Sequence, residues 1–174
     1  MQKLILFLFS FVVLWSCNSQ KVTIDYDRNV NFAQIKSYRI DETVQNGIND
    51  LDKERLYAAL EQNFRYRGVI KSENSDVDLR IQPNEYVSNK TNSSVGIGLG
   101  GFGNVIGGGV SVGVPISSKK LNQEYIVSMY QNNRMIWEGI LVLEMPLNAS
   151  ADVKQESINK GVSKLLSKYP PKGN

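Results

Sequence analysis

The stretch Tyr125–Met145 reads YIVSMYQNNRMIWEGILVLEM and decides the fold. Apolar and polar residues alternate over 125–131 and 135–145, which is the period of a half-buried β-strand. Asn132–Asn133 lies between the two runs, and asparagine tolerates positive φ angles. A tight two-residue turn and an antiparallel hairpin are therefore favoured. The predicted register places two pairs of residues opposite each other, Met129 with Ile136 and Tyr130 with Met135.

Shorter runs of the same period occur earlier in the chain. Alternation and β-branched residues predict four further strand segments, over 22–26, 35–40, 69–70 and 77–81. Pro83 is expected to interrupt the last of them, because proline has no backbone N–H to donate to a neighbouring strand.

Two amphipathic segments predict helices. Asp50 is expected to cap a helix that Gly68 ends, and Ser150 a second helix that Pro170–Pro171 ends. The apolar face of the second helix consists of Ile158, Val162, Leu165, Leu166 and Tyr169. Its solvent side is expected to carry Lys154, Lys160 and Lys164, with Glu156 and Lys160 as an i, i+4 pair.

These elements predict an α+β fold, in which a small antiparallel sheet has two helices packed on one face. Residues 22–174 form a single domain of ordinary size. A glycine-rich insertion at 91–118 is expected to be a hairpin or a loop.

The first residues of the chain have the pattern of a bacterial lipoprotein signal. Lys3 gives a positive start, residues 4–15 are apolar except for one serine, and Ser16 precedes Cys17. Such an apolar stretch is too short to span a bilayer. The pattern predicts cleavage of residues 1–16, lipidation of Cys17 and a short lipidated tether over 17–21.

Composition excludes several kinds of site. The chain has no histidine, and its single cysteine is assigned to lipid, so no disulfide, Cys/His zinc site, thiol nucleophile or histidine proton shuttle is expected. A formal net charge of +3 without a basic stripe gives no reason to expect nucleic-acid binding. We predict no cofactor and no metal ion.

The middle of the chain is uncharged and rich in glycine. Residues 91–118 carry no charge and contain nine of the 14 glycines. Alternation with valine, isoleucine and leucine favours two short strands or a loop, while repeated GxxxG spacing is also found where helices pack in lipid. A third interpretation is a surface that binds a partner. The candidate interaction surface consists of Gly96, Gly98, Gly100, Gly103, Gly107 and Gly109.

Three short motifs match enzyme signatures but lack their context. Gly98–Gly103 fits G-x-G-x-x-G, but no helix is predicted after it. Gly109–Gly113 fits the nucleophile elbow G-x-S-x-G, but the chain has no histidine to act as the base for Ser111. Ser117–Lys120 fits S-x-x-K, although Pro115 favours a loop there. We interpret all three as chance matches.

Two pairs of carboxylates and three aromatic residues are the remaining candidates. Asp25 and Asp27 share a face if their segment is a strand, and so do Asp76 and Asp78. Either pair could bind a hard cation or act as acid and base. The simpler interpretation is that they face solvent opposite core residues. Trp137, Tyr125 and Tyr130 could bind a ligand, but are better explained as packing within the hairpin.

Several of these segments together resemble a known family. They are Val22–Asp27, Phe32, Lys36–Tyr38, Gly68, Asp76–Leu79, Ile136–Gly139 and Tyr169–Pro170. In this order, with the glycine-rich middle, the chain resembles a bacterial lipoprotein family of the DUF4136-like type, a domain of unknown function. The resemblance implies the fold class and a location in the cell envelope, and it implies no reaction.

The sequence therefore predicts a non-enzymatic envelope lipoprotein with a binding or scaffolding role at the membrane surface. Its expected partners are the membrane, through the lipid anchor, and a protein that the sequence does not identify. Asn18 is not the aspartate that retains lipoproteins in the inner membrane, so the periplasmic side of the outer membrane is expected. One alternative is a membrane-perturbing lipoprotein that uses residues 95–116, and another is an enzyme that uses carboxylates alone.

Overall fold

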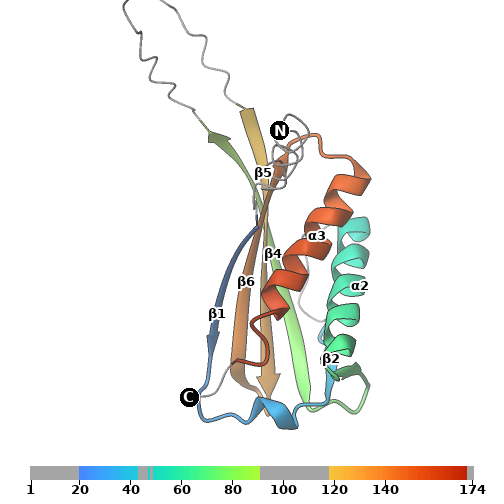
Figure 1. The fold of residues 1–174 in the computed structure, drawn as a ribbon, viewed down its shortest axis with the longest axis vertical. Coiled ribbons are helices and arrows are strands. Elements are labelled where there is room, and N and C mark those ends of the chain that lie inside the picture. Colours follow the sequence, from blue (N-terminus) through green and yellow to red (C-terminus); the bar gives the residue numbers. More distant parts are fainter. Residues whose placement is uncertain (1–19, 43–46, 48, 91–117, 172–174) are drawn as a thin grey trace, which may run out of the picture.

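The computed structural model describes residues 20–42, 47, 49–90 and 118–171. Cys17 and the six glycines of the candidate surface lie outside these residues. The described chain forms a six-stranded sheet with helices α2 and α3 packed on one face (Figure 1). Its elements are β1 (Gln20–Tyr26), the 3₁₀ helix η2 (Phe32–Gln34), β2 (Ser37–Ile40), α2 (Asp50–Tyr66), β3 (Ile70–Lys71), β4 (Val77–Lys90), β5 (Ser118–Gln131), β6 (Arg134–Pro146) and α3 (Ala151–Leu166).

The order of strands in the sheet is β1-β6-β5-β4-β2-β3. The α+β class and the two helices on one face are confirmed, but the sheet is mixed. Strands β1, β6, β5 and β4 are antiparallel, whereas β2 pairs in parallel with β4 and β3. The parallel pairing arises because α2 crosses back over the sheet after β2, as parallel neighbours require.

The predicted central hairpin is present, with one change of register. Asn132 and Asn133 adopt φ angles of 50° and 61°, as the tight turn requires, and Tyr130 pairs with Met135. Met129 pairs with Trp137, so its predicted pairing with Ile136 is wrong. A β-bulge next to the turn shifts the register by one residue.

Several predicted boundaries differ from the structure. Strand β5 begins at Ser118, so Ser118–Lys120 lie in a strand and not in the predicted loop, and α3 ends at Leu166, before the predicted stop at Pro170–Pro171. Strand β1 begins at Gln20, within the predicted tether. Strand β2 begins at Ser37, because a 3₁₀ helix capped by Asn31 occupies the chain just before it. Helix α2 is capped by Asn49, whose side chain accepts a hydrogen bond from the Leu51 N–H, and not by Asp50.

Pro83 does not interrupt β4, which continues to Lys90. The Leu79 carbonyl in β4 accepts a hydrogen bond from the Asp41 N–H, which directly follows β2. The backbone N–H and C=O of Leu79 therefore point toward β2 and away from β5. Pro83 lies four residues further along the same side, and β2 pairs with β4 only over 77–79. The missing N–H of the proline therefore leaves the ladder between β4 and β5 intact.

The predicted helix faces form the core. Gly68 ends α2 with a φ of 76°, Ser150 caps α3, and the predicted apolar residues of α3 are all buried. Gly161 lets α3 approach β6 closely, because a Cβ atom there would lie 2.5 Å from Leu143 Cδ2. Each buried leucine or isoleucine stabilises the fold by about 1.5–3 kcal/mol.

Candidate functional site

The strand register places the start of β1 beside the part of the β5–β6 hairpin that is far from its turn. Gln20 pairs with Leu143, which pairs with Gln123, which in turn pairs with Glu85. The N-terminal turns of α2 and α3 lie at this same end of the sheet (Figure 1). We call it the Gln20 end, and we call the opposite end, with the Asn132–Asn133 turn, the Asn132 end.

Strands β4 and β5 extend beyond the other strands at the Gln20 end. Their pairing continues five residues past Glu85, as far as Lys90 opposite Ser118. The chain therefore leaves β4 and returns to β5 at the tip of this ribbon. Cys17 comes three residues before Gln20, so the predicted lipidation residue also precedes the fold at this end.

A buried polar network lies beneath the Gln20 end and was not predicted. The Asp52 side chain in the first turn of α2 is 1% exposed. It accepts hydrogen bonds from Arg55 at 2.6 Å, Lys154 at 2.9 Å and Gln123 at 3.0 Å. The Tyr125 hydroxyl donates to Gln123 Oε1 at 3.1 Å. The network therefore joins α2, α3 and β5.

These hydrogen bonds control the ionisation of Asp52. Burial alone would raise the pKa of this carboxyl, but hydrogen bonds from Lys154, Gln123 and Arg55 outweigh it and hold the pKa below its usual value. Asp52 is thus an ionised, fully partnered carboxylate. Such a group suits positioning of the helices better than proton transfer, which needs a pKa near the working pH.

Lys154 and Lys164 were predicted to face solvent, but both have partners in the structure. Lys154 forms an ion pair with Asp52. Lys164 Nζ donates to the Gln20 carbonyl at 2.8 Å, and Lys168 Nζ donates to the Val22 carbonyl at 3.2 Å. Lys164 in α3 and Lys168 just after it therefore connect the C-terminal part of the chain to β1, the strand that follows the predicted anchor. The predicted Glu156–Lys160 pair is present, exposed on the helix surface.

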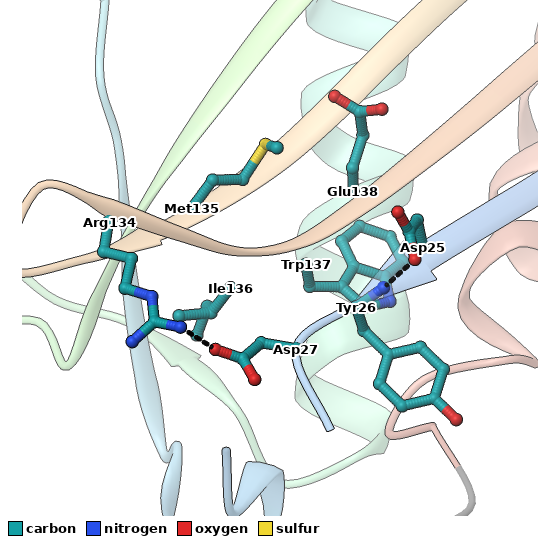
Figure 2. A pocket seen from close by; sticks show the side chains of 8 residues that line it. All are labelled: Asp25, Tyr26, Asp27, Arg134, Met135, Ile136, Trp137 and Glu138. Carbon is teal, nitrogen blue, oxygen red and sulfur yellow. Dashed lines mark hydrogen bonds and ion pairs between the residues drawn. The ribbon is translucent and has the colours of Figure 1, made fainter. Parts of the chain in front are cut away.

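A cavity of about 300 Å³ lies between β1 and β6 at the Asn132 end (Figure 2). Arg134 reaches across it to Asp27, with 2.5 Å between Nη2 and Oδ2. The Asn29 backbone N–H, together with Arg134, holds the pKa of Asp27 below its usual value. Asp25 accepts a hydrogen bond from the Tyr26 N–H. The cavity therefore presents a paired carboxylate and not a carboxylic acid ready to donate a proton.

The two predicted pairs of aspartates do not converge. Asp25 on β1 and Asp78 on β4 are separated by two strands, a distance of at least about 14 Å at normal strand spacing. Asp76 accepts three hydrogen bonds from the Lys36–Ser37 segment, and Asp78 pairs with Arg39. Among the described residues, no three acidic or cysteine side chains gather as a metal site.

The aromatic candidates are mainly structural. Trp137 and Tyr125 are buried in the core. The Arg80 guanidinium lies 4.1 Å from the centroid of the Tyr130 ring. Packing within the hairpin therefore explains these residues, as the simpler interpretation expected.

The chain is similar to one protein family of known sequence pattern. A family model described as "Domain of unknown function (DUF4136)" matches residues 22–171. The chain belongs to the DUF4136 family. The sequence matches no curated protein.

Solved structures share the fold at low sequence identity. The PelC dodecamer from Paraburkholderia phytofirmans is 10% identical with a TM-score of 0.51, covering 85% of this chain and 95% of that chain. A PDZ domain protein from Parabacteroides distasonis is 16% identical with a TM-score of 0.51, and the match covers 90% of this chain but 36% of that one. A DUF4136 family protein from Bacteroides thetaiotaomicron is 13% identical with a TM-score of 0.47, covering 88% of this chain and 97% of that chain.

Proposed function

We propose that this DUF4136 protein is a non-enzymatic lipoprotein of the cell envelope that binds or scaffolds a partner at the membrane surface. One observation carries the proposal: β1 begins at Gln20, only three residues after the cysteine of the signal pattern. Processing before Cys17 would leave the folded domain intact and place its lipid next to the sheet. Among the described residues, no helix is long and apolar enough to cross a membrane.

The architecture supports a binding role. The carboxylates are paired or spread over separate strands, while Lys164 and Lys168 connect the anchor-bearing strand to the core. The likeness to PelC, which was solved as a dodecamer, supports an assembly of several copies as one form of scaffold. We place the protein on the periplasmic side of the outer membrane.

Replacing the lipidation residue tests the anchor. Cys17→Ser should abolish incorporation of a fatty-acid analogue during growth and release the protein from the membrane fraction. Ser19→Ala, two residues away, should be labelled and sedimented like the wild type. Equal labelling of Cys17→Ser and the wild type would contradict the proposal.

A second candidate function is perturbation of the membrane by residues 95–116. It is favoured by the register, because Lys90 and Ser118 bring both ends of the glycine-rich stretch to the end where the anchor is proposed. Dye leakage from liposomes should then require this stretch. Equal leakage with and without residues 95–116 would remove this candidate and leave the binding role.

A further inference from the structure

Large apolar side chains are exposed at the Gln20 end, on several different elements. They come from the first turns of α2 and α3, the tip of β4 and the connection from β6 to α3. The residues are Leu51, Tyr86, Val87, Leu147 and Val153. Because neighbouring elements contribute them, they surround the end of the sheet and do not form a stripe along one helix.

The covalent chain limits how far this end can lie from a lipid anchor. Gln20 is the third residue after Cys17, so at full extension the chain from Cys17 to Gln20 spans no more than about 11 Å. The β4–β5 ribbon reaches five residues beyond the Gln20 row, which is about 17 Å along the strands. If the sheet stands on the anchored end, the ribbon is longer than the tether, so its tip must reach the bilayer.

The charge of this end does not oppose contact with lipid. The charged residues at this end are of both signs: Lys53, Lys119 and Lys120 are basic, and Asp50, Glu54, Glu85 and Asp152 are acidic. Asp52 is buried and paired, so it presents no charge outward. The mixture favours contact through apolar side chains, in the way that peripheral proteins bury apolar groups at the headgroup boundary.

We propose that the Gln20 end is a membrane-docking surface, and that Leu51, Val87 and Leu147 enter the headgroup region of the bilayer that holds the Cys17 lipid. This inference rests on the proposed lipoprotein function and adds an orientation to it. The sheet stands on its Gln20 end, and the cavity between β1 and β6 lies at the opposite end, remote from the membrane. A partner would therefore approach the Asn132 end.

The chain supplies matched controls at the Asn132 end. Leu51 is 59% exposed and Ile70 57%, while Leu147 is 49% exposed and Met135 47%. Each pair compares side chains of similar size and exposure at opposite ends. The natural cysteine carries the lipid in the processed protein, so an introduced cysteine is the only free thiol.

The experiment uses the full chain, processed and lipidated in a bacterial host and reconstituted into phosphatidylcholine–phosphatidylethanolamine vesicles. Four variants are labelled with an environment-sensitive fluorophore: Leu51→Cys, Leu147→Cys, Ile70→Cys and Met135→Cys. Flotation reports the anchor, and emission wavelength with iodide quenching reports docking. Val153→Cys and Tyr66→Cys replace any pair in which a variant fails to melt cooperatively.

Docking predicts a blue shift and a several-fold loss of iodide quenching at 51 and 147, with no change at 70 and 135. Floating protein whose four labels all remain exposed to iodide would overturn the docking surface and leave the anchor intact. A shift at 70 and 135 would overturn the proposed orientation. Protein that does not float would overturn the anchor and, with it, this inference.

Discussion

The two ends of the sheet differ most in their interiors. At the Gln20 end a charged network is buried around Asp52, while large apolar side chains such as Leu147 are exposed. At the Asn132 end the interior is aromatic, and the surface carries ion pairs such as Arg134–Asp27. One end therefore holds its helices by directional bonds, and it exposes apolar side chains beside charges of both signs. The other end holds its elements by aromatic packing, and its surface carries ion pairs together with exposed apolar side chains such as Ile70 and Met135.

The aromatic interior of the Asn132 end is centred on Tyr169. Its ring makes edge contacts with Phe32, Phe64 and Trp137, with ring centroids 5.7–6.0 Å apart. The hydroxyls of Tyr38 and Tyr169 and the indole N–H of Trp137 are buried without a hydrogen-bond partner among the described residues. Burial raises the pKa of both tyrosines to about 12. Packing outweighs the loss of these hydrogen bonds.

This comparison makes removal of the Asp52 carboxylate the largest expected effect. Asp52→Ala leaves Lys154 and Gln123 without their shared acceptor, so it should lower the free energy of unfolding by about 2–3 kcal/mol. Asp50→Ala, an exposed carboxylate in the same first turn, should change it by less than about 1 kcal/mol. Urea unfolding monitored by circular dichroism measures both. Similar losses would mean that the network is not what stabilises the Gln20 end.

The same residue predicts how stability changes in acid. Because the folded-state pKa of Asp52 is lowered, its contribution is complete above the unfolded value of about 3.8 and is lost as pH falls through the folded value. The difference in unfolding free energy between wild type and Asp52→Asn should therefore be largest above about pH 5 and shrink below about pH 4. Urea titrations across this range measure it. A difference independent of pH would show that the lowered pKa does not stabilise the fold.

Removing one hydroxyl at each end gives the smallest and most closely matched test. Tyr125→Phe should destabilise by about 1 kcal/mol, because its hydroxyl donates to Gln123 at the Gln20 end. Tyr38→Phe should be neutral or stabilising by up to about 1 kcal/mol, because it removes a buried hydroxyl without a partner. Thermal unfolding of the two variants measures the contrast. Equal changes in stability would mean that the hydrogen-bonded interior of the Gln20 end and the aromatic interior of the Asn132 end do not differ in this respect.

Local patterns allowed much of the fold to be predicted. Two asparagines specified the hairpin turn, and the spacing of apolar residues identified the buried face of α3. The β-bulge at Met129 and the parallel pairing of β2 depend on packing between distant segments, so alternation could not indicate them. Pro83 was also misleading, because its effect on the strand depends on which side of β4 its nitrogen faces, and only the strand pairing shows that side.

Among the candidate functional residues, too, only those in a local sequence pattern could be predicted. Cys17 was identified because a lipoprotein signal is a continuous local pattern, and its lipidation stays a prediction. Asp52 looked like an ordinary acidic residue near a helix N-terminus. Its partners Gln123 and Lys154 lie 71 and 102 residues away in the chain, so only the folded structure brings the network together.

Hydrogen exchange tests most directly which end of the molecule meets the membrane. The measurement compares the lipidated chain on zwitterionic vesicles with residues 18–174 free in solution. The amides of Glu85 and Val87 point away from β5, so bilayer contact should slow their exchange, while residues 66–71 at the Asn132 end should exchange equally in both samples. Slowed exchange at 66–71 with unchanged exchange at Glu85 and Val87 would contradict the account.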